Sequence, residues 1–173
     1  LSKPAEAGVT YDLFLKEFPT SALHTEVRMR KAETVLQGGD IAAAQKMFGE
    51  VAGVEGFASA DHAVFRQAYC AAKLENLGEA GKLYAKLATD FPESTYRGDA
   101  TISAGRAFYR ANDFANATTW FQKSIDAGQA EAPEAAHWIC RIHLQANEPA
   151  KAIALAEQQL PKAAESTFLV NLK

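Results

Sequence analysis

The repeat unit of this chain is clearest in residues 61–94, which read DHAVFRQAYCAAKLENLGEAGKLYAKLATDFPES. Apolar residues recur at helical spacing, first around Phe65 and again around Tyr84. Asn76-Leu77-Gly78 stands between the two runs, and turn-forming residues of this kind interrupt a helix. Pro92 ends the second run, because proline cannot continue a helix. The stretch therefore predicts two helices joined by a turn at 76–78.

A small residue followed four positions later by an aromatic one recurs along the whole chain. Residues four apart lie on one face of a helix, so the small residue allows a close approach and the aromatic ring fills the joint. The leading alanines of five such pairs are 37, 36, 37 and 35 residues apart. This period is typical of stacked helical repeats. The pairs are Ala7/Tyr11, Ala44/Phe48, Ala80/Tyr84, Ala117/Phe121 and Ala152/Ala156, the last without its aromatic ring.

The two-helix plan divides the chain into repeats. We predict a half repeat at 1–21, followed by full repeats at about 22–58, 59–95, 96–131 and 132–165. The predicted fold is all-α, with about nine helices in antiparallel hairpins that stack into a right-handed superhelix, as a single domain over 1–173. Because the chain begins with Leu1 and not with methionine, we expect a fragment or a processed form of a longer protein.

Composition and charge exclude several classes of protein. The apolar fraction is 48%, which is enough for a core, and the formal net charge of −3 gives no reason to expect a nucleic-acid partner. No apolar run approaches the ~20 residues that would span a bilayer, so we predict no membrane insertion. Cys70 and Cys140 are two repeats apart, and we interpret them as buried packing residues.

The sequence contains no pattern that we interpret as catalytic or metal-binding. His137 and His143 are six residues apart, so they point in different directions from one helix. A glycine-rich phosphate loop and paired cysteine ligands are both missing from the sequence. Glu131 and Glu134 are expected on a solvated face at a helix start. We therefore predict no enzymatic activity, no cofactor and no metal.

The repeat unit resembles the tetratricopeptide repeat. Ala68 and Gly105 stand where that family has small residues on the first helix, and Pro19 and Pro92 stand where it closes the unit. The Phe-Pro-x-Ser endings at 18–21 and 91–94 are similar to those of tetratricopeptide proteins of bacterial cell envelopes. This second resemblance would imply a periplasmic or envelope location, which the residues themselves leave undetermined.

In the family that the chain resembles, the first helices of successive hairpins line a concave surface. The resemblance therefore implies a groove lined by cations and aromatic rings, because such residues recur at spacings of three, four and seven. The groove would take a protein or peptide, acidic or with a C-terminal carboxylate. An ordinary solvated face and a nucleic-acid groove are the alternatives. The candidate residues are Arg66, Tyr69, Lys73, Arg106, Tyr109, Arg110, His137, Trp138 and Arg141.

Two classes of function remain open from the sequence. The first is a non-enzymatic scaffold that binds a peptide or a partner protein along its concave surface. The second is a helical accessory domain of a larger enzyme, such as a lytic transglycosylase. An autonomous enzyme would need a catalytic constellation that the sequence does not show.

Overall fold

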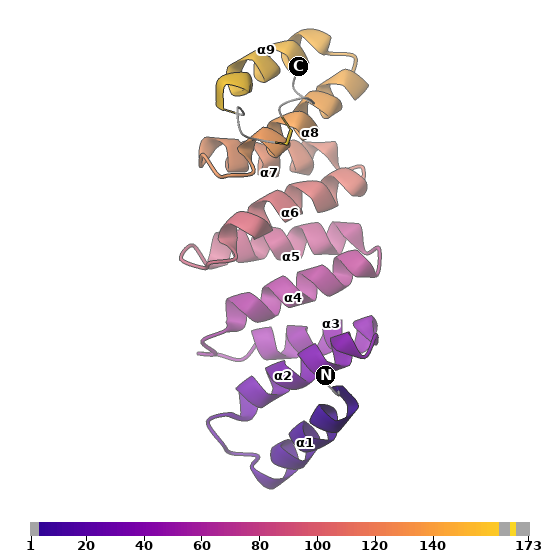
Figure 1. The fold of residues 1–173 in the computed structure, drawn as a ribbon, viewed down its shortest axis with the longest axis vertical. Helices are drawn as coiled ribbons and strands as arrows, with labels where there is room; N and C mark the ends of the chain where they lie inside the picture. The colour runs from indigo at the N-terminus through magenta and orange to yellow at the C-terminus, as the bar shows by residue number, and fades with distance from the viewer. Residues whose placement is uncertain (1–3, 163–166, 169–173) are drawn as a thin grey trace. The chain divides into compact units, whose positions relative to one another are not determined.

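The computed structural model describes residues 4–162 and 167–168, and every regular element in these residues is helical (Figure 1). The all-α repeat fold is therefore confirmed. The predicted end of the last repeat, at residue 165, lies outside the described residues. The elements are α1 (Pro4–Glu17), α2 (His24–Gln37), α3 (Ile41–Ala52), α4 (Ala60–Lys73), α5 (Leu77–Asp90), α6 (Arg97–Arg110), α7 (Phe114–Asp126), α8 (Ala132–Gln145), α9 (Pro149–Gln159) and the short 3-10 helix η1 (Leu160–Lys162).

The turn inside each hairpin has the same length and conformation. Three residues separate α2 from α3, α4 from α5, α6 from α7 and α8 from α9. The middle residue has a positive φ each time, 93° in one case and 59° in the other three. Glycine and asparagine adopt this left-handed conformation with least strain. The middle residues are Gly39, Glu75, Asn112 and Asn147.

The second of these turns differs from the sequence prediction. We expected it at residues 76–78, but α5 begins at Leu77 and the turn occupies residues 74–76. Gly78 suggested a break, yet it is accommodated in the first turn of α5. The left-handed residue is instead Glu75. Glutamate lacks the short polar side chain that makes this conformation less costly for asparagine.

Glu75→Asn is expected to stabilise the protein by about 0.5–1 kcal/mol, because asparagine adopts a positive φ with less strain than glutamate does. The measurement is urea-induced unfolding followed by circular dichroism. Asn112→Glu is the matched reverse change at the equivalent turn, and it should destabilise the protein by a similar amount. If both variants were as stable as the parent, φ at these positions would not limit stability.

The Phe-Pro-x-Ser sequences form the same link between hairpins in both places. The Ser21 N–H donates to the carbonyl oxygen of Phe18 at 3.2 Å, and the Ser94 N–H donates to that of Phe91 at 3.1 Å. Each serine hydroxyl then accepts from the backbone N–H two residues later. The motif is therefore a compact turn that ends one helix and leads into the next.

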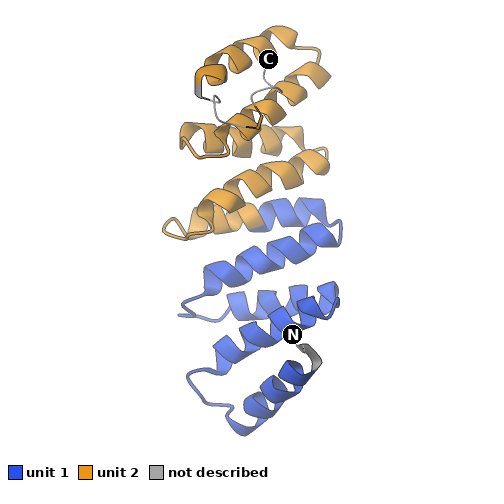
Figure 2. Ribbon diagram, viewed as in Figure 1, with its two compact units in different colours: residues 1–83 blue, residues 84–173 orange. Residues whose placement is uncertain are grey.

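The chain divides into two compact units, with the boundary between Leu83 and Tyr84 inside α5 (Figure 2). In the first unit α1, α2, α3 and α4 pack in chain order, each against its neighbour. Ala44 and Phe48 of α3 are fully buried in its core, as the alanine–aromatic pattern predicted. Phe57, in the link after α3, folds back and packs against this core.

The second unit repeats the arrangement with α6, α7, α8 and α9, which also pack in chain order. Ala117 and Phe121 of α7 are fully buried. Gly105 of α6 lies directly beneath the Phe121 ring, where an added Cβ atom would come within 2.5 Å of two ring carbons. Here glycine is required by close approach and not by its backbone conformation.

Candidate protein-binding site

The predicted site residues lie on the first helices of three hairpins and fall into both units. Three of them are on α4 in the first unit, and the other six are on α6 and α8 in the second. Each unit therefore holds a separate cluster of arginine and aromatic side chains.

In the first unit, Arg66 is bound by a carboxylate that the sequence prediction did not include. Its Nε donates to Glu33 Oε1 at 2.6 Å and its Nη2 donates to Glu33 Oε2 at 2.5 Å. The guanidinium also lies 5.3 Å from the centre of the Tyr69 ring, and the Lys73 ammonium lies 5.5 Å from the same ring. The fork to Glu33 compensates the charge of Arg66, so Lys73 is the exposed cation of this cluster.

The Arg66–Glu33 pair borders a pocket of about 460 Å³ between α1, α2 and α4. His62 lies on its wall, with Nε2 3.8 Å from Glu33 Oε1. Burial lowers the pKa of His62, and the nearby Glu33 carboxylate only partly offsets this. The pocket therefore holds a compensated ion pair beside an imidazole that stays neutral at pH 7.

In the second unit, two aromatic rings support an exposed arginine. The rings of Tyr109 and Trp138 lie 4.8 Å apart between centres. The Arg141 guanidinium lies 5.1 Å from the Trp138 ring and 5.8 Å from the Tyr109 ring. His137 adds an edge contact to Trp138 at 5.3 Å. No carboxylate of the described residues pairs with Arg141, so this cluster offers a positive charge on a rigid aromatic base.

Arg106 of the second unit is paired, like Arg66 in the first. Its Nε donates to Glu134 Oε1 at 2.5 Å and its Nη2 donates to Glu134 Oε2. The Trp138 Nε1–H also donates to Glu134 Oε1, at 3.0 Å. We expected Glu134 on a solvated face, and this was wrong: its side chain is only 10% exposed and is paired with Arg106 of α6.

The two carboxylates lie on the first helices of their hairpins, as the predicted groove residues do. If the repeat alanine is numbered 20, Glu33 is at position 9 and Glu134 at position 2, and Arg106 and Arg141 are at position 9 of their own repeats. The prediction selected cations and aromatic residues on the first helices and left the acidic residues aside. The signal that could have found the pairs is opposite charge at groove positions of adjacent repeats.

Protonation of Glu134 at low pH is expected to weaken the second unit. Burial by itself raises the pKa of the Glu134 carboxyl, but hydrogen bonds from Arg106 and Trp138 outweigh it and hold the pKa below the ordinary 4.5. A group whose pKa is lowered by folding stabilises the fold above its unfolded-state pKa, and this contribution is lost as the pH falls. The free energy of unfolding should therefore decrease as the pH falls below that value.

Urea unfolding at a series of pH values measures this effect. Both tryptophans of the chain, Trp120 and Trp138, lie in the second unit, so their fluorescence reports on it. Glu134→Gln keeps the shape of the side chain and removes its titration, so its stability should depend less on pH than that of the parent. Identical pH profiles for parent and variant would contradict a folded-state role for the carboxylate.

The described residues contain no group of three potential ligands that could hold a metal ion. Cys70 and Cys140 are both free and buried. Burial raises the pKa of the Cys70 thiol to about 11, so it stays protonated at neutral pH. No helix among these residues has the length and apolar character needed to cross a membrane.

Antiparallel helix hairpins joined by a constant turn, with a buried alanine and aromatic ring on most second helices, define a helical repeat protein. The sequence pattern of the tetratricopeptide repeat family matches residues 29–95. The predicted repeat family is thereby confirmed for these residues. No curated protein matches the chain significantly.

Two solved structures share the fold along most of the chain. Both contain the nearly identical TPR-like repeats of a Podosopora anserina protein designated a kinesin light chain. One has a TM-score of 0.66 at 13% identity and covers 95% of this chain and 89% of that chain. The other, a variant in which one glutamine is replaced by methionine, has a TM-score of 0.65 at 13% identity and covers 94% and 88%. These matches concern the fold alone, and they give no support to the predicted similarity to bacterial cell-envelope proteins.

Proposed function

We propose that this chain is a non-enzymatic protein-interaction module, and that the α6–α8 face of its second unit binds an acidic segment of a partner protein. Tetratricopeptide repeats generally mediate protein–protein interactions, and residues 29–95 match that family. The alternative of an accessory domain in a lytic transglycosylase has no support in the comparisons.

One observation carries the choice of surface. Arg141 is exposed, lies over the rings of Tyr109 and Trp138, and has no carboxylate partner among the described residues. Arginine binds carboxylates through a planar fork, and aromatic rings add rigid contact area at small entropic cost. Arg66 already binds Glu33, and Arg106 already binds Glu134. In this proposal these two arginines hold the neighbouring side chains in place, and Arg141 makes the contact with the partner.

The remaining predicted residues have supporting places in the proposal. Arg110 is exposed at the end of α6, one residue from Tyr109, and His137 contacts Trp138. In the first unit, Tyr69 and Lys73 form a smaller pair of the same kind on α4. A nucleic-acid partner is disfavoured, because the net charge is −3 and two of the groove arginines are compensated.

The test is selection of binding peptides from a random display library with the chain as bait, followed by affinity measurement with the purified peptides. Enrichment of acidic peptides is expected, with binding that weakens as salt is added. Arg141→Glu should weaken binding by more than about tenfold, as expected when a charge-assisted contact becomes repulsive.

Lys46→Glu is the matched control, because it makes the same charge change at an exposed position of α3 in the other unit. It should leave the affinity within about twofold of the parent, since the charge lies outside the α6–α8 face and exposed charges are screened by salt. If both variants lost affinity equally, the loss would come from the change in net charge and not from a contact of Arg141. Selection of peptides without acidic residues, or no effect of Arg141→Glu, would refute the proposal.

A further inference from the structure

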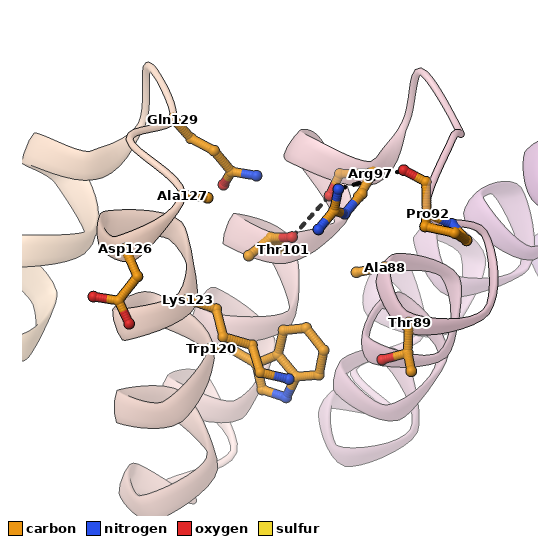
Figure 3. Close-up of a pocket in the computed structure, with 10 residues that line it drawn as sticks. All are labelled: Ala88, Thr89, Pro92, Arg97, Thr101, Trp120, Lys123, Asp126, Ala127 and Gln129. Carbon is orange, nitrogen blue, oxygen red and sulfur yellow. Dashed lines mark hydrogen bonds between the residues drawn. The ribbon is translucent and has the colours of Figure 1, made fainter.

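The second unit has a separate pocket on the opposite side of α6. Its lining comes from the last turn of α5 and the link after it, the first turns of α6, and α7 with the link that follows α7 (Figure 3). Its volume is about 520 Å³, which is within the range of small-ligand sites. Arg97 and Thr101 of α6 line it, and they are roughly 180° around the helix from Arg106 and Arg110 at ~100° per residue. The pocket is therefore not part of the surface proposed above.

Two cations line this pocket without a carboxylate partner among the described residues. The Lys123 ammonium lies 3.8 Å from the centre of the Trp120 ring. Arg97 has one long hydrogen bond, from Nη1 to the carbonyl oxygen of Pro92 at 3.4 Å, so most of its N–H groups remain available. Here the cations are uncompensated, whereas a glutamate pairs with Arg106 on the opposite side of α6 and another with Arg66 in the first unit.

The polar side chains around the two cations can complete the binding of a carboxylate. The amide nitrogen of Gln129 points into the pocket in Figure 3, while its Oε1 is buried and has no hydrogen-bond partner. A half-turn of this amide exchanges the two atoms, so Gln129 can present a donor or an acceptor to a ligand. Asp126 points away from the pocket and accepts a hydrogen bond from Gln122 at 2.8 Å.

The charge of the lining favours a carboxylate over a phosphate. Arg97 and Lys123 contribute two positive charges and Asp126 one negative, which leaves one positive charge. A carboxylate carries one negative charge, whereas a phosphoserine carries about −1.5 to −2 at pH 7. The Trp120 ring and the neighbouring Ala88 and Ala127 supply an apolar floor for the methylene groups of the ligand.

We propose that this pocket binds the side-chain carboxylate of a glutamate in an extended segment of a second polypeptide. The carboxylate lies between Arg97 and Lys123, its methylene groups pack on Trp120, and the Gln129 amide bonds to the adjacent peptide group. This second site would let the module hold two acidic segments at once, one on each side of α6.

The test uses a capped five-residue peptide with a central glutamate among alanines, titrated into the chain labelled with 15N at tryptophan. The indole signals report separately on the two sites, Trp120 on the pocket and Trp138 on the Arg141 cluster, and Trp→Phe variants assign them. We expect a saturable shift of the Trp120 signal with a dissociation constant in the millimolar range. The same peptide with glutamine in place of the central glutamate should bind at least about fivefold more weakly, because it lacks the negative charge.

Arg97→Ala with Lys123→Ala should remove the Trp120 shift, since both residues are exposed and the fold should persist, as circular dichroism would verify. Arg110→Ala, on the other face of α6, is the control and should retain the Trp120 shift.

The proposal is overturned if the Trp120 signal does not move, moves equally with the glutamine peptide, or still moves in the double variant. Stronger binding of the equivalent phosphoserine peptide would overturn the assignment to a carboxylate. Failure of Arg141→Glu to weaken its own peptides would leave the Trp120 result unaffected, so the two proposals fail independently.

Discussion

Gly105→Ala is expected to lower the free energy of unfolding by about 2 kcal/mol, although alanine is the better helix former. The new Cβ atom would stand 2.5 Å from two carbons of the Phe121 ring, which is fully buried and cannot turn aside without disturbing its neighbours. Overpacking of this kind costs up to about 3 kcal/mol, and the gain in helix propensity offsets only about 1 kcal/mol.

Urea unfolding followed by tryptophan fluorescence measures this loss in the unit where it occurs. Gly98→Ala is the matched control, because Gly98 is in the same helix and its added Cβ would meet only Gln129 Nε2, at 3.8 Å. That variant should be as stable as the parent or slightly more stable. Equal stability of the Gly105 and Gly98 variants would mean that α6 and α7 can separate at little cost.

The second large effect is expected at the Arg106–Glu134 pair. Arg106→Leu should cost about 2 kcal/mol, because it leaves a buried carboxylate with one remaining hydrogen bond, from Trp138. The cost is below that of a fully buried pair, since the Arg106 side chain is 45% exposed and water can reach the site. Replacing both residues with leucine should cost less than the single change, because no charge is then left buried.

The four proteins of this double-mutant cycle give the coupling energy of the pair. Arg97→Leu is the control, because Arg97 is on the same helix and has no carboxylate partner among the described residues. It should change stability by no more than about 0.5 kcal/mol. Additive effects of the two leucine substitutions would show that the pair does not act as a unit. The same pairing makes Arg106 a poor probe of binding, because changes there alter folding.

The sequence was sufficient to predict the repeat architecture. The alanine–aromatic period predicted buried second helices, and Ala44, Phe48, Ala117 and Phe121 are all fully buried. This prediction was correct because the packing of helices depends on a short, regular pattern of small and large residues. Phe57 packs against the same core from a link, because a large apolar side chain gains from burial.

The electrostatics of the site could not be predicted in the same way. Arg66 and Glu33 are 33 residues apart, and Arg106 and Glu134 are 28 apart in the opposite direction along the chain. Which cation meets which carboxylate depends on the register of one helix against another, and a difference of one turn would separate them. The pocket beside Trp120 is harder still to predict, because residues from three helices and two links form it.

The constant three-residue turn has a consequence for how this chain can change in length. The first helices α2, α4, α6 and α8 all have 14 residues, so the differences in repeat length arise after them. The second helices vary from 11 to 14 residues, and the links that follow α3, α5 and α7 differ in length as well. Insertions and deletions should therefore be tolerated in the links between hairpins and should destabilise the protein in the turns inside them. The links are 53–59, 91–96 and 127–131, and the turns are 38–40, 74–76, 111–113 and 146–148. An engineer who wishes to fuse a reporter to this scaffold, or to graft a repeat into it, should cut at the links and keep each hairpin whole.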